Sequence, residues 1–507
     1  MSKPLEGVRV LEVAAWTFVP AAGAILADLG AEVIKVEPPT GDPQRALKNM
    51  LNLDKNGPNP FNEVPNRGKR SITIDLTKPE GRDVVLKLAA DSDVFLTSYL
   101  PEVRKKLRLD VDDVRAANPK IIYARGSGWG SKGPMKDTGG YDLAAGWATS
   151  GFAKRLLDSI GDDAPPPQPP AFYDLQGGNT LAGAISTALF KRERTGEPSI
   201  VDVSLMNVGM WSMSPDLVSA PYMAPTIPDR TSPGNPLTNW YKTADGRWIY
   251  LVLLQADRFW GELCEVMQRP DLKDDERFSN TAVRFQNKQE CVRTLDEIFG
   301  SADLAEWRRR LEHFSGVWAP VLDVKEVHSH PQIEPNGYLP WLTDNEGIEF
   351  RIVASPMSFD DEPTVPQGAA PELGQDTEMI LKKGLGPDRR PPRSRRPRLN
   401  LLDRGQRVLD HRTAVRCRRW SSETVNDVHP NASSAFANLA DFVVLLGPIP
   451  GASRLHRRKL ENHCSACGRQ HLDFAASNEV SAARRDDAGG RFGLVVLVAL
   501  WVEHLTG

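Results

Sequence analysis

Apolar and polar residues follow one another along the first 205 residues in a pattern that predicts alternating strands and helices. Residues 8–13 are predicted as a strand, residues 20–29 as a helix that Pro20 opens and Gly30 closes, and residues 31–37 as the next strand. The same alternation recurs further along, with strands at 71–76, 93–96, 121–124 and 200–205, and helices at 78–90, after Pro101 and at 175–194. These repeated units predict an α/β fold with a doubly wound parallel sheet, a Rossmann-like large domain over residues 1–205.

The pattern changes after residue 205. Residues 206–236 are rich in Pro, Ser and Met and have weak periodicity, which predicts a linker. A smaller α+β domain is predicted over 237–325, and residues 326–386 are expected to return to the large domain. The smaller domain is predicted to contain a strand at 248–253 and helices at 258–267, 288–299 and 304–314.

The last part of the chain differs in composition from the rest. Residues 387–507 hold 19 arginines and a single lysine, and the Arg-Pro run at 387–398 cannot continue a helix or a strand. We interpret 387–507 as an unassigned, disordered tail produced by a shift of reading frame. A zinc site at Cys464, Cys467 and His471 is the alternative, although no second Cys pair accompanies it.

Composition narrows the class of protein. A chain of 507 residues with 40% apolar composition can bury a sizeable core. No segment approaches the roughly twenty apolar residues that a membrane span needs, and the N-terminus lacks a signal sequence, so we expect a cytoplasmic protein with no membrane association. Five unevenly spaced cysteines agree with a reducing compartment, and we expect no nucleic-acid partner at a net charge of -3.

Several kinds of active site are disfavoured. The first strand-to-helix turn, residues 14–21, lacks the glycines of a dinucleotide site, and no Gly-x-Ser-x-Gly elbow occurs. Only three histidines lie in the first 386 residues, and no metal signature is found there. A carboxylate is therefore the best candidate nucleophile.

Asp174 is the carboxylate that the sequence singles out. It stands shortly before Gly177, Gly178 and a predicted helix. An Asp in this position can cap the helix, or it can act as a nucleophile that a bulky cofactor approaches closely. The pattern alone leaves both readings open.

A set of short segments, in order over residues 3–385, resembles the class III coenzyme A transferases. This is the CaiB/BaiF family, which includes formyl-CoA transferase. The segments are 5–12, 29–37, 66–72, 118–122, 140–142, 171–180, 243–246 and 373–378.

The resemblance implies a ring-shaped subunit with a large and a small domain, and an obligate homodimer in which two subunits interlock. It also implies the reaction: Asp174 attacks an acyl-CoA, forms a mixed anhydride and then an aspartyl thioester, and an acceptor carboxylic acid takes over the CoA. Coenzyme A is thus a substrate, and no permanently bound cofactor or metal is expected.

Physical reasoning agrees with this role. Partial desolvation makes a carboxylate more reactive, and helix-start amides with Gly177 and Gly178 could hold negative charge on the thioester oxygen. The two glycines would also leave room for the CoA sulfur. Close packing of the helix is their alternative explanation.

Cations must meet the phosphates of CoA. Arg104, Lys105 and Lys106 are the leading group, with Lys69 and Arg70 behind them, and a solvated basic face is the alternative for each. By family correspondence, the CoA contacts also include Trp16, Thr17, Ile74, Thr77, Ser98 and Tyr99, and Lys106 matches an Arg that contacts the nucleotide.

The chain departs from formyl-CoA transferase at several positions. Pro38 and Gly139 replace an Arg and a Lys, Thr17 replaces a Gln near the acyl group, and residues 232–236 poorly match the family's glycine run. Formate and oxalate are therefore not expected as substrates. We expect the substrate to be a medium or bulky organic acid.

The same fold also hosts α-methylacyl-CoA racemases, whose acid/base His lies in a Gly-His-Asp motif. Here Gly140 is followed by Tyr141 and Asp142, so that base is missing and transfer is favoured, with Tyr141 and Asp142 lining the site. A racemase or dehydratase of acyl-CoA esters is the alternative. A second alternative is an inactive CoA-binding product, because the family's final helix is replaced by the tail.

Overall fold

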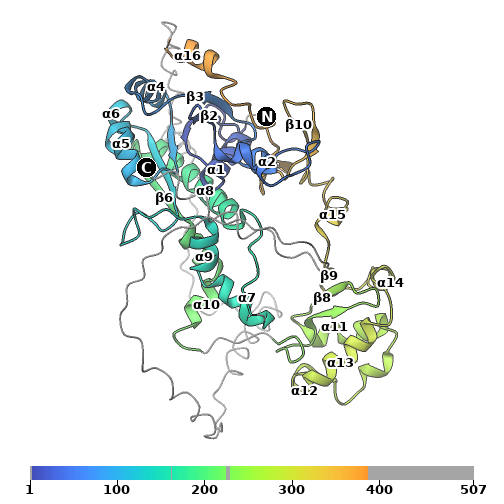
Figure 1. Cartoon of the computed structure of the whole chain (residues 1–507). Coiled ribbons are helices and arrows are strands. Elements are labelled where there is room, and N and C mark those ends of the chain that lie inside the picture. Colours follow the sequence, from blue (N-terminus) through green and yellow to red (C-terminus); the bar gives the residue numbers. More distant parts are fainter. Residues whose placement is uncertain (1–2, 162, 224–228, 386–507) are drawn as a thin grey trace, which may run out of the picture. The chain divides into compact units, whose positions relative to one another are not determined.

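The structure is a computed structural model that describes residues 3–161, 163–223 and 229–385 (Figure 1). Every described residue belongs to the first of the chain's two units, Met1–Arg396. The predictions for 387–507, including the zinc site at Cys464, Cys467 and His471, lie outside the described residues.

Six parallel strands form the central sheet, in the order β3-β2-β1-β4-β5-β6. Its inner strands are largely buried, because helices cover both faces, and β1 and β2 carry buried charged residues among their apolar ones. Strand β1 pairs with β2 on one side and β4 on the other, with Val10 opposite Val33 and Val94. The order reverses between β1 and β4, so the doubly wound sheet that the sequence predicts is confirmed. The strands are β1 Arg9–Val13, β2 Glu32–Glu37, β3 Arg70–Thr73, β4 Val94–Thr97, β5 Ile122–Ser127 and β6 Ile200–Ser204.

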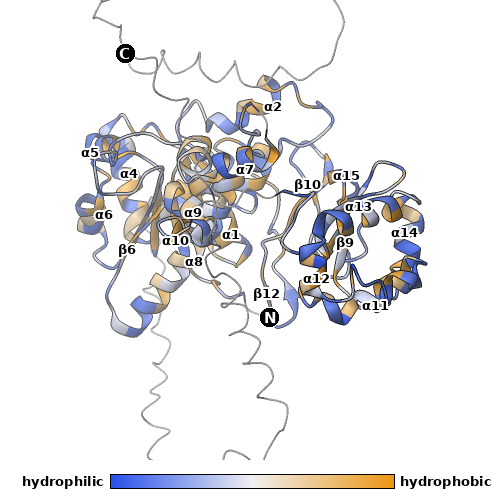
Figure 2. Ribbon diagram, turned by 90° about the horizontal axis from the view of Figure 1, so that it is seen from below, coloured by the Kyte–Doolittle hydropathy of each residue, from blue (hydrophilic) through white to orange (hydrophobic). Residues whose placement is uncertain are grey.

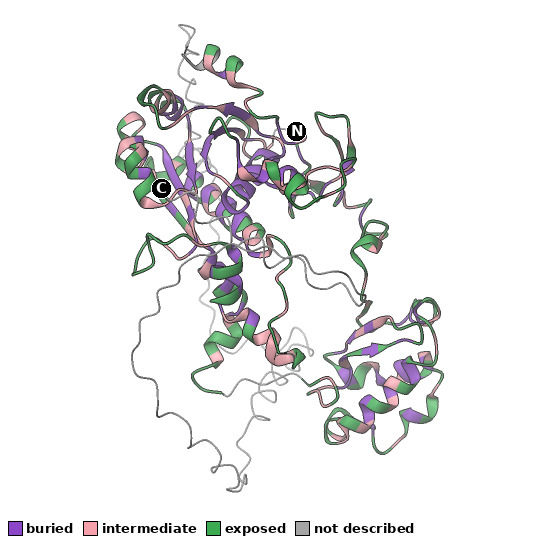
Figure 3. Ribbon diagram, viewed as in Figure 1, coloured by how far each residue is buried: buried purple, intermediate pink, exposed green. Residues whose placement is uncertain are grey.

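Each face of the sheet has its own apolar core. Val10 of β1 packs with α1 (Phe18–Asp28) and α8 (Phe172–Thr195). The next residue, Leu11, points to the opposite face and joins side chains of α4 (Pro79–Ala90), α6 (Val111–Ala117) and α16 (Thr377–Leu385). Figure 2 shows apolar residues concentrated around the sheet, and Figure 3 shows its strands and α1 largely buried.

Residues 237–320 have a separate core. Strands β7 (Thr238–Lys242), β8 (Trp248–Val252) and β9 (Trp318–Pro320) form an antiparallel sheet. Helices α11 (Ala256–Val266), α13 (Lys288–Phe299) and α14 (Leu304–Arg310) pack on it through residues such as Trp260, Leu295 and Trp307. The sequence predicts β8 and these three helices but not β7, in which only every second residue is buried.

Two helices that were not predicted lie at the start of the segment predicted as a linker, residues 206–236. Helix α9 (Leu205–Ser212) starts where the Ser204 side chain accepts a hydrogen bond from the Asn207 amide, and α10 (Ser214–Ser219) has a proline in its first turn. Four further short elements before β6 were not predicted: η1 Pro43–Ala46, α2 Leu47–Met50, α3 Pro60–Asn66 and the π-helix η2 Leu143–Ala148. Helix α5 (Pro101–Leu107) matches the predicted helix after Pro101, whereas α7 (Phe152–Ile160) was missed.

Residues 324–385 contain α15 (Val324–Val327), the hairpins β10–β11 and β12–β13, and α16. Hydrogen bonds join this segment to the central sheet: the Gly374 amide donates to Ser71 Oγ at 2.9 Å, and the Ser71 amide donates to Asp376 at 3.1 Å. These contacts agree with the predicted return to the large domain. The hairpin strands are Trp341–Thr343 with Glu349–Arg351, and Ser358–Phe359 with Glu362–Pro363.

Candidate active site

The loop after β1, residues 14–17, lies where the strand order reverses. Ligands of open parallel sheets bind at this point, beyond the carboxyl ends of the strands. The Ala15 amide donates to Ser98 Oγ at 3.1 Å, which joins the loop to the end of β4. The structure therefore brings four predicted CoA contacts, Trp16, Thr17, Ser98 and Tyr99, to one edge of the sheet.

Two other predicted CoA contacts follow β3. Ile74 is buried in the core that Leu11 belongs to, and Thr77 is exposed with its hydroxyl donating to Asp75 at 2.6 Å. Since β3 is also parallel to β1, these residues lie at the same end of the sheet as the β1 loop.

Asp174 lies inside the first turn of α8 and does not cap it. The helix begins at Phe172, three residues earlier than predicted, and its N-cap is Ala171, which has a left-handed φ of 56°. The amides of Tyr173 and Asp174 in this turn lie close enough to the Asp142 carboxylate, from another segment, to lower its pKa. The cap interpretation of Asp174 is thus wrong, and its carboxylate is left free of that duty.

The two carboxyl groups, Asp142 and Asp174, influence each other's ionisation. Burial raises the pKa of Asp174 to about 8, and the neighbouring Asp142 carboxylate adds to the shift. Burial also raises the pKa of Asp142, although Gln168 and the helix amides that donate to it act in the opposite direction. The pair therefore holds a proton more tightly than isolated aspartates do, which is a property of functional carboxylates.

Tyr141 connects Asp142 to the loop after β1. Its ring meets the Trp16 indole edge to face, with centroids 5.6 Å apart and an angle of 85°. Both rings are partly open to solvent, 36% for Trp16 and 56% for Tyr141. Trp16, Tyr141, Asp142 and the start of α8 thus form a continuous chain of contacts.

Gly177 and Gly178 lie where α8 packs against α1. Both lie beyond the first turn of α8, where helix amides bond to the preceding turn. A Cβ at Gly177 would lie 2.6 Å from the Phe18 ring, and one at Gly178 would lie 2.7 Å from the Ala21 Cβ. The glycines are needed because α8 packs closely on α1, which is the alternative explanation that the sequence left open.

The predicted cations separate into buried and exposed groups. Arg104 is buried, pairs with Asp110 at 3.1 Å and donates to the Tyr99 carbonyl, so it organises the protein itself. Lys69 is fully buried against Glu12, and Arg70 bridges Glu32 and Asp376. Lys105 and Lys106 are the exposed ones, because they lie on the outer side of α5.

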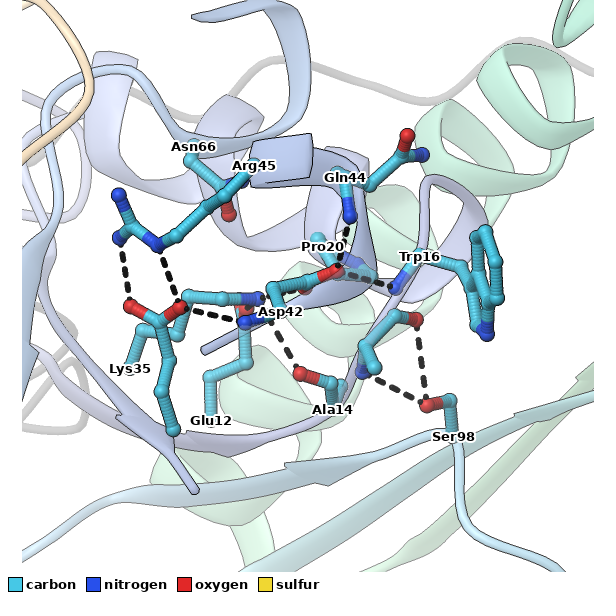
Figure 4. Close-up of polar contacts among 12 residues, drawn as sticks. Glu12, Ala14, Trp16, Pro20, Lys35, Asp42, Gln44, Arg45, Asn66 and Ser98 are labelled. Carbon is cyan, nitrogen blue, oxygen red and sulfur yellow. Dashed lines mark hydrogen bonds and ion pairs between the residues drawn. The ribbon is translucent and has the colours of Figure 1, made fainter. Parts of the chain in front are cut away.

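The sequence analysis missed a buried ion-pair network beneath α1 (Figure 4). Lys35 Nζ lies 3.2 Å from Glu12 and 2.9 Å from Asp42, and Lys69 Nζ lies 2.7 Å from Glu12. Beside it, Arg45 pairs with Glu37 at 2.7 Å, which holds the pKa of Glu37 at about 2 against the effect of burial. The sequence did contain a signal for this network, namely the charged residues Glu12 and Lys35 within strands that are buried on both faces. Charges in such positions require partners of opposite charge.

The sequence model of CoA-transferase family III matches residues 5–377. The chain belongs to this family. It is therefore an enzyme of the CoA-transferase class.

Relatives within family III act on different acids. The chain is 30% identical over 385 residues to an (R)-2-hydroxy-4-methylpentanoate CoA-transferase of Clostridioides difficile, covering 76% of this chain and 96% of the relative. It is 31% identical to the succinyl-CoA:glutarate CoA-transferase of Mus musculus, covering 76% and 87%. A crystal structure of a CaiB/BaiF family protein from Brucella suis superposes with a TM-score of 0.65 at 26% identity, covering 76% of this chain and all of that one.

Two further observations concern metals and membranes. Among residues 3–161, 163–223 and 229–385, no cluster of three or more His, Cys, Asp or Glu side chains could hold a metal ion. In the same part of this family III chain, no helix has the length and apolar character to cross a membrane.

Proposed function

We propose that this chain is an acyl-CoA:carboxylate CoA-transferase that works through covalent intermediates on Asp174. The observation that carries the proposal is the state of this carboxylate. It is half-buried at the start of α8, and burial together with the charge of Asp142 raises its pKa. Such an environment destabilises the charged form and makes the ionised carboxylate a better nucleophile.

The proposed reaction balances without any outside oxidant or metal. An oxygen of ionised Asp174 attacks the thioester carbon, the C–S bond breaks, and CoA departs as the thiolate. The acyl group is then bound to Asp174 as a mixed anhydride. The thiolate then attacks the Asp174 carbonyl carbon, which releases the first acid as its carboxylate and leaves an aspartyl-CoA thioester. The acceptor carboxylate repeats the two steps in reverse, so that a new acyl-CoA forms and Asp174 is regenerated.

The proposed CoA site lies at the edge of the sheet where β1 and β4 end. Its position at the reversal of strand order, together with the exposed Lys105 and Lys106, supports it. We propose that Trp16, Thr17, Ser98 and Tyr99 meet the thioester arm of CoA. Ile74, Thr77 and Lys106 then meet its nucleotide.

We further propose that the enzyme is a cytoplasmic homodimer of interlocked subunits, with domain boundaries at 205, 237 and 326. Exposed apolar side chains on and after α9 and α10 support an interface, because Trp211 is 81% and Tyr222 86% accessible in the single chain. Light scattering on the purified chain should give twice the monomer mass.

Replacement of Asp174 tests the proposal. Asp174→Ala should abolish CoA transfer between acyl-CoAs and a panel of acids, whereas the wild type should form a new acyl-CoA that mass spectrometry detects. Hydroxylamine added during turnover should trap a hydroxamate on the peptide that contains Asp174. Asp271→Ala, which removes an exposed aspartate paired with Arg269, is the matched control and should retain activity.

Unimpaired transfer by a folded Asp174→Ala dimer would contradict the proposal. Exchange of the substrate's α-hydrogen with deuterium from solvent, without any acceptor acid, would instead support a racemase.

A further inference from the structure

Trp16 has an unusual backbone conformation. Its φ is 69°, in the left-handed region that bulky residues rarely adopt and that costs about 1 kcal/mol or more outside glycine. Such a conformation persists only where surrounding groups hold it. The residue that carries the strain is also one whose side chain lies at the candidate active site.

Side chains from three other segments hold each residue of the 14–17 loop in turn (Figure 4). Lys35 Nζ donates to the Ala14 carbonyl at 3.1 Å, and the Ala15 amide donates to Ser98 Oγ at 3.1 Å. The Trp16 amide donates to Asp42 Oδ1 at 3.3 Å, and the Gln44 side chain donates to Thr17 Oγ1. Hydrogen bonds from other segments therefore hold four consecutive residues in place. Asp42 is the residue that holds the strained backbone of Trp16.

Asp42 is itself fixed in place. Its Oδ2 lies 2.9 Å from Lys35 Nζ, its Oδ1 also accepts from the Gln44 amide at 3.1 Å, and its own amide donates to Glu37 at 3.0 Å. All of these groups are almost completely buried. The carboxylates of Asp42, Glu12 and Glu37 together raise the pKa of Lys35 against the effect of burial, so Lys35 stays charged beside Asp42.

The hydrogen bond to Asp42 holds an aromatic surface against Tyr141, the residue that precedes Asp142. The Trp16 indole, held by its backbone, packs edge to face on Tyr141, and Asp142 follows Tyr141 in the chain. In the described part of the chain, the pKa of Asp174 is shifted by burial and by Asp142, with no lysine or arginine contributing. A second carboxylate on a substrate would thus meet apolar rings and like charge there.

We propose that Trp16 is a specificity-determining residue for an apolar acyl group, and that Asp42 is the positioning residue that holds it against Tyr141. The inference rests on the proposed CoA transfer at Asp174 and names the substrate class of that site: straight, branched or aryl monocarboxylic acids, with dicarboxylic acids disfavoured. The positioning passes through the Trp16 backbone, and Asp42 itself touches no substrate.

The test measures identity exchange, in which each acyl-CoA is incubated with the isotopically labelled form of its own acid. Pentanoyl-CoA and glutaryl-CoA have the same chain length and differ in a terminal methyl or carboxylate group, and phenylpropanoyl-CoA supplies an aryl case. The wild type should exchange both apolar compounds at least roughly tenfold faster, by kcat/KM, than glutaryl-CoA.

Variants separate the two roles. Trp16→Ala and Asp42→Ala should each lower the pentanoyl-to-glutaryl ratio by roughly tenfold, and the double variant should lower it no further, because both act through one side chain. Asp42→Asn keeps an oxygen that accepts from the Trp16 amide and should largely restore the ratio. Trp341→Ala removes another exposed tryptophan and should leave the ratio unchanged.

The outcomes distinguish this inference from the proposed function. Equal exchange of pentanoyl-CoA and glutaryl-CoA by the wild type, or a ratio unchanged in a folded Trp16→Ala, overturns the inference and leaves CoA transfer intact. Absence of exchange with all three compounds overturns both. Additive effects in the double variant would show that Asp42 acts by another route.

Discussion

Two groups of buried carboxylates within the large domain differ in how their charge is balanced. Beneath α1, Glu12 has two lysine partners, Lys35 and Lys69, within about 3 Å, and all three side chains are inaccessible to solvent. At the start of α8, Asp142 and Asp174 have amide and Gln168 donors but no cation that shifts the pKa of Asp174. The first group thus has its charge balanced by buried cations, whereas in the second group no cation offsets the raised pKa of Asp174.

Gly23 shows how closely the first group is built into the fold. A Cβ there would lie 2.0 Å from a Glu12 oxygen and 3.0 Å from Lys69 Nζ, so α1 can cross the ion pairs only with glycine at this position. Near the start of α8, by contrast, the rings of Trp16 and Tyr141 are partly open to solvent.

Removal of Glu12 should produce the largest effect on stability. Glu12→Ala leaves Lys35 and Lys69 buried without their shared partner, so the free energy of unfolding should fall by about 3 to 5 kcal/mol. Urea denaturation at fixed protein concentration measures the change. Glu32→Ala is the matched control: its carboxylate also pairs with two cations, Arg9 and Arg70, but is 35% accessible, so it should cost about 1 kcal/mol or less. Equal losses for both variants would contradict the comparison.

The sequence predicts the central sheet well because its strands are short apolar runs separated by proline-started helices and glycine stops. The start of α8 was placed three residues late, and the role of Asp174 stays a prediction. The error has a physical cause: the first turn of α8 lies beside Asp142, which is 32 positions away and was assigned only to the lining of the site. Long-range partners of this kind cannot be read from local patterns.

Long-range partners also affect the residues that were predicted to contact CoA. Contacts of Lys106 and Trp16 with CoA stay predictions, whereas Arg104 and Lys69 look like free cations in the sequence and are paired with Asp110 and Glu12 in the fold. Asp42, which holds the Trp16 backbone, carries no local signal beyond a charge next to a glycine turn.

Replacement of Asp174 should have the opposite sign from replacement of Glu12. Its folded pKa is raised, so between about pH 4 and 8 the folded state binds more protons than the unfolded one, and ionisation lowers stability as the pH rises. Asp174→Asn should therefore stabilise the protein by roughly 1 to 3 kcal/mol at pH 8 and by little at pH 4. Urea denaturation at the two pH values measures this, and destabilisation at pH 8 would contradict it.

Neutralising Asp142 should have the smallest effect, a shift in the pH dependence of turnover. Asp142→Asn keeps an oxygen beside the Tyr173 and Asp174 amides but removes the charge that opposes ionisation of Asp174. The pKa of Asp174 should fall, so the acidic limb of the kcat profile should move to lower pH by about one unit. Burial, the larger cause of the shift, remains in this variant, so the limb should stay well above the pH at which an exposed aspartate titrates. Asp142→Ala should show the same pH shift together with about 1 kcal/mol lower stability, because it also removes the oxygen beside these amides. An acidic limb that does not move in Asp142→Asn would mean that burial alone sets the ionisation of Asp174, and that the two carboxyl groups act independently.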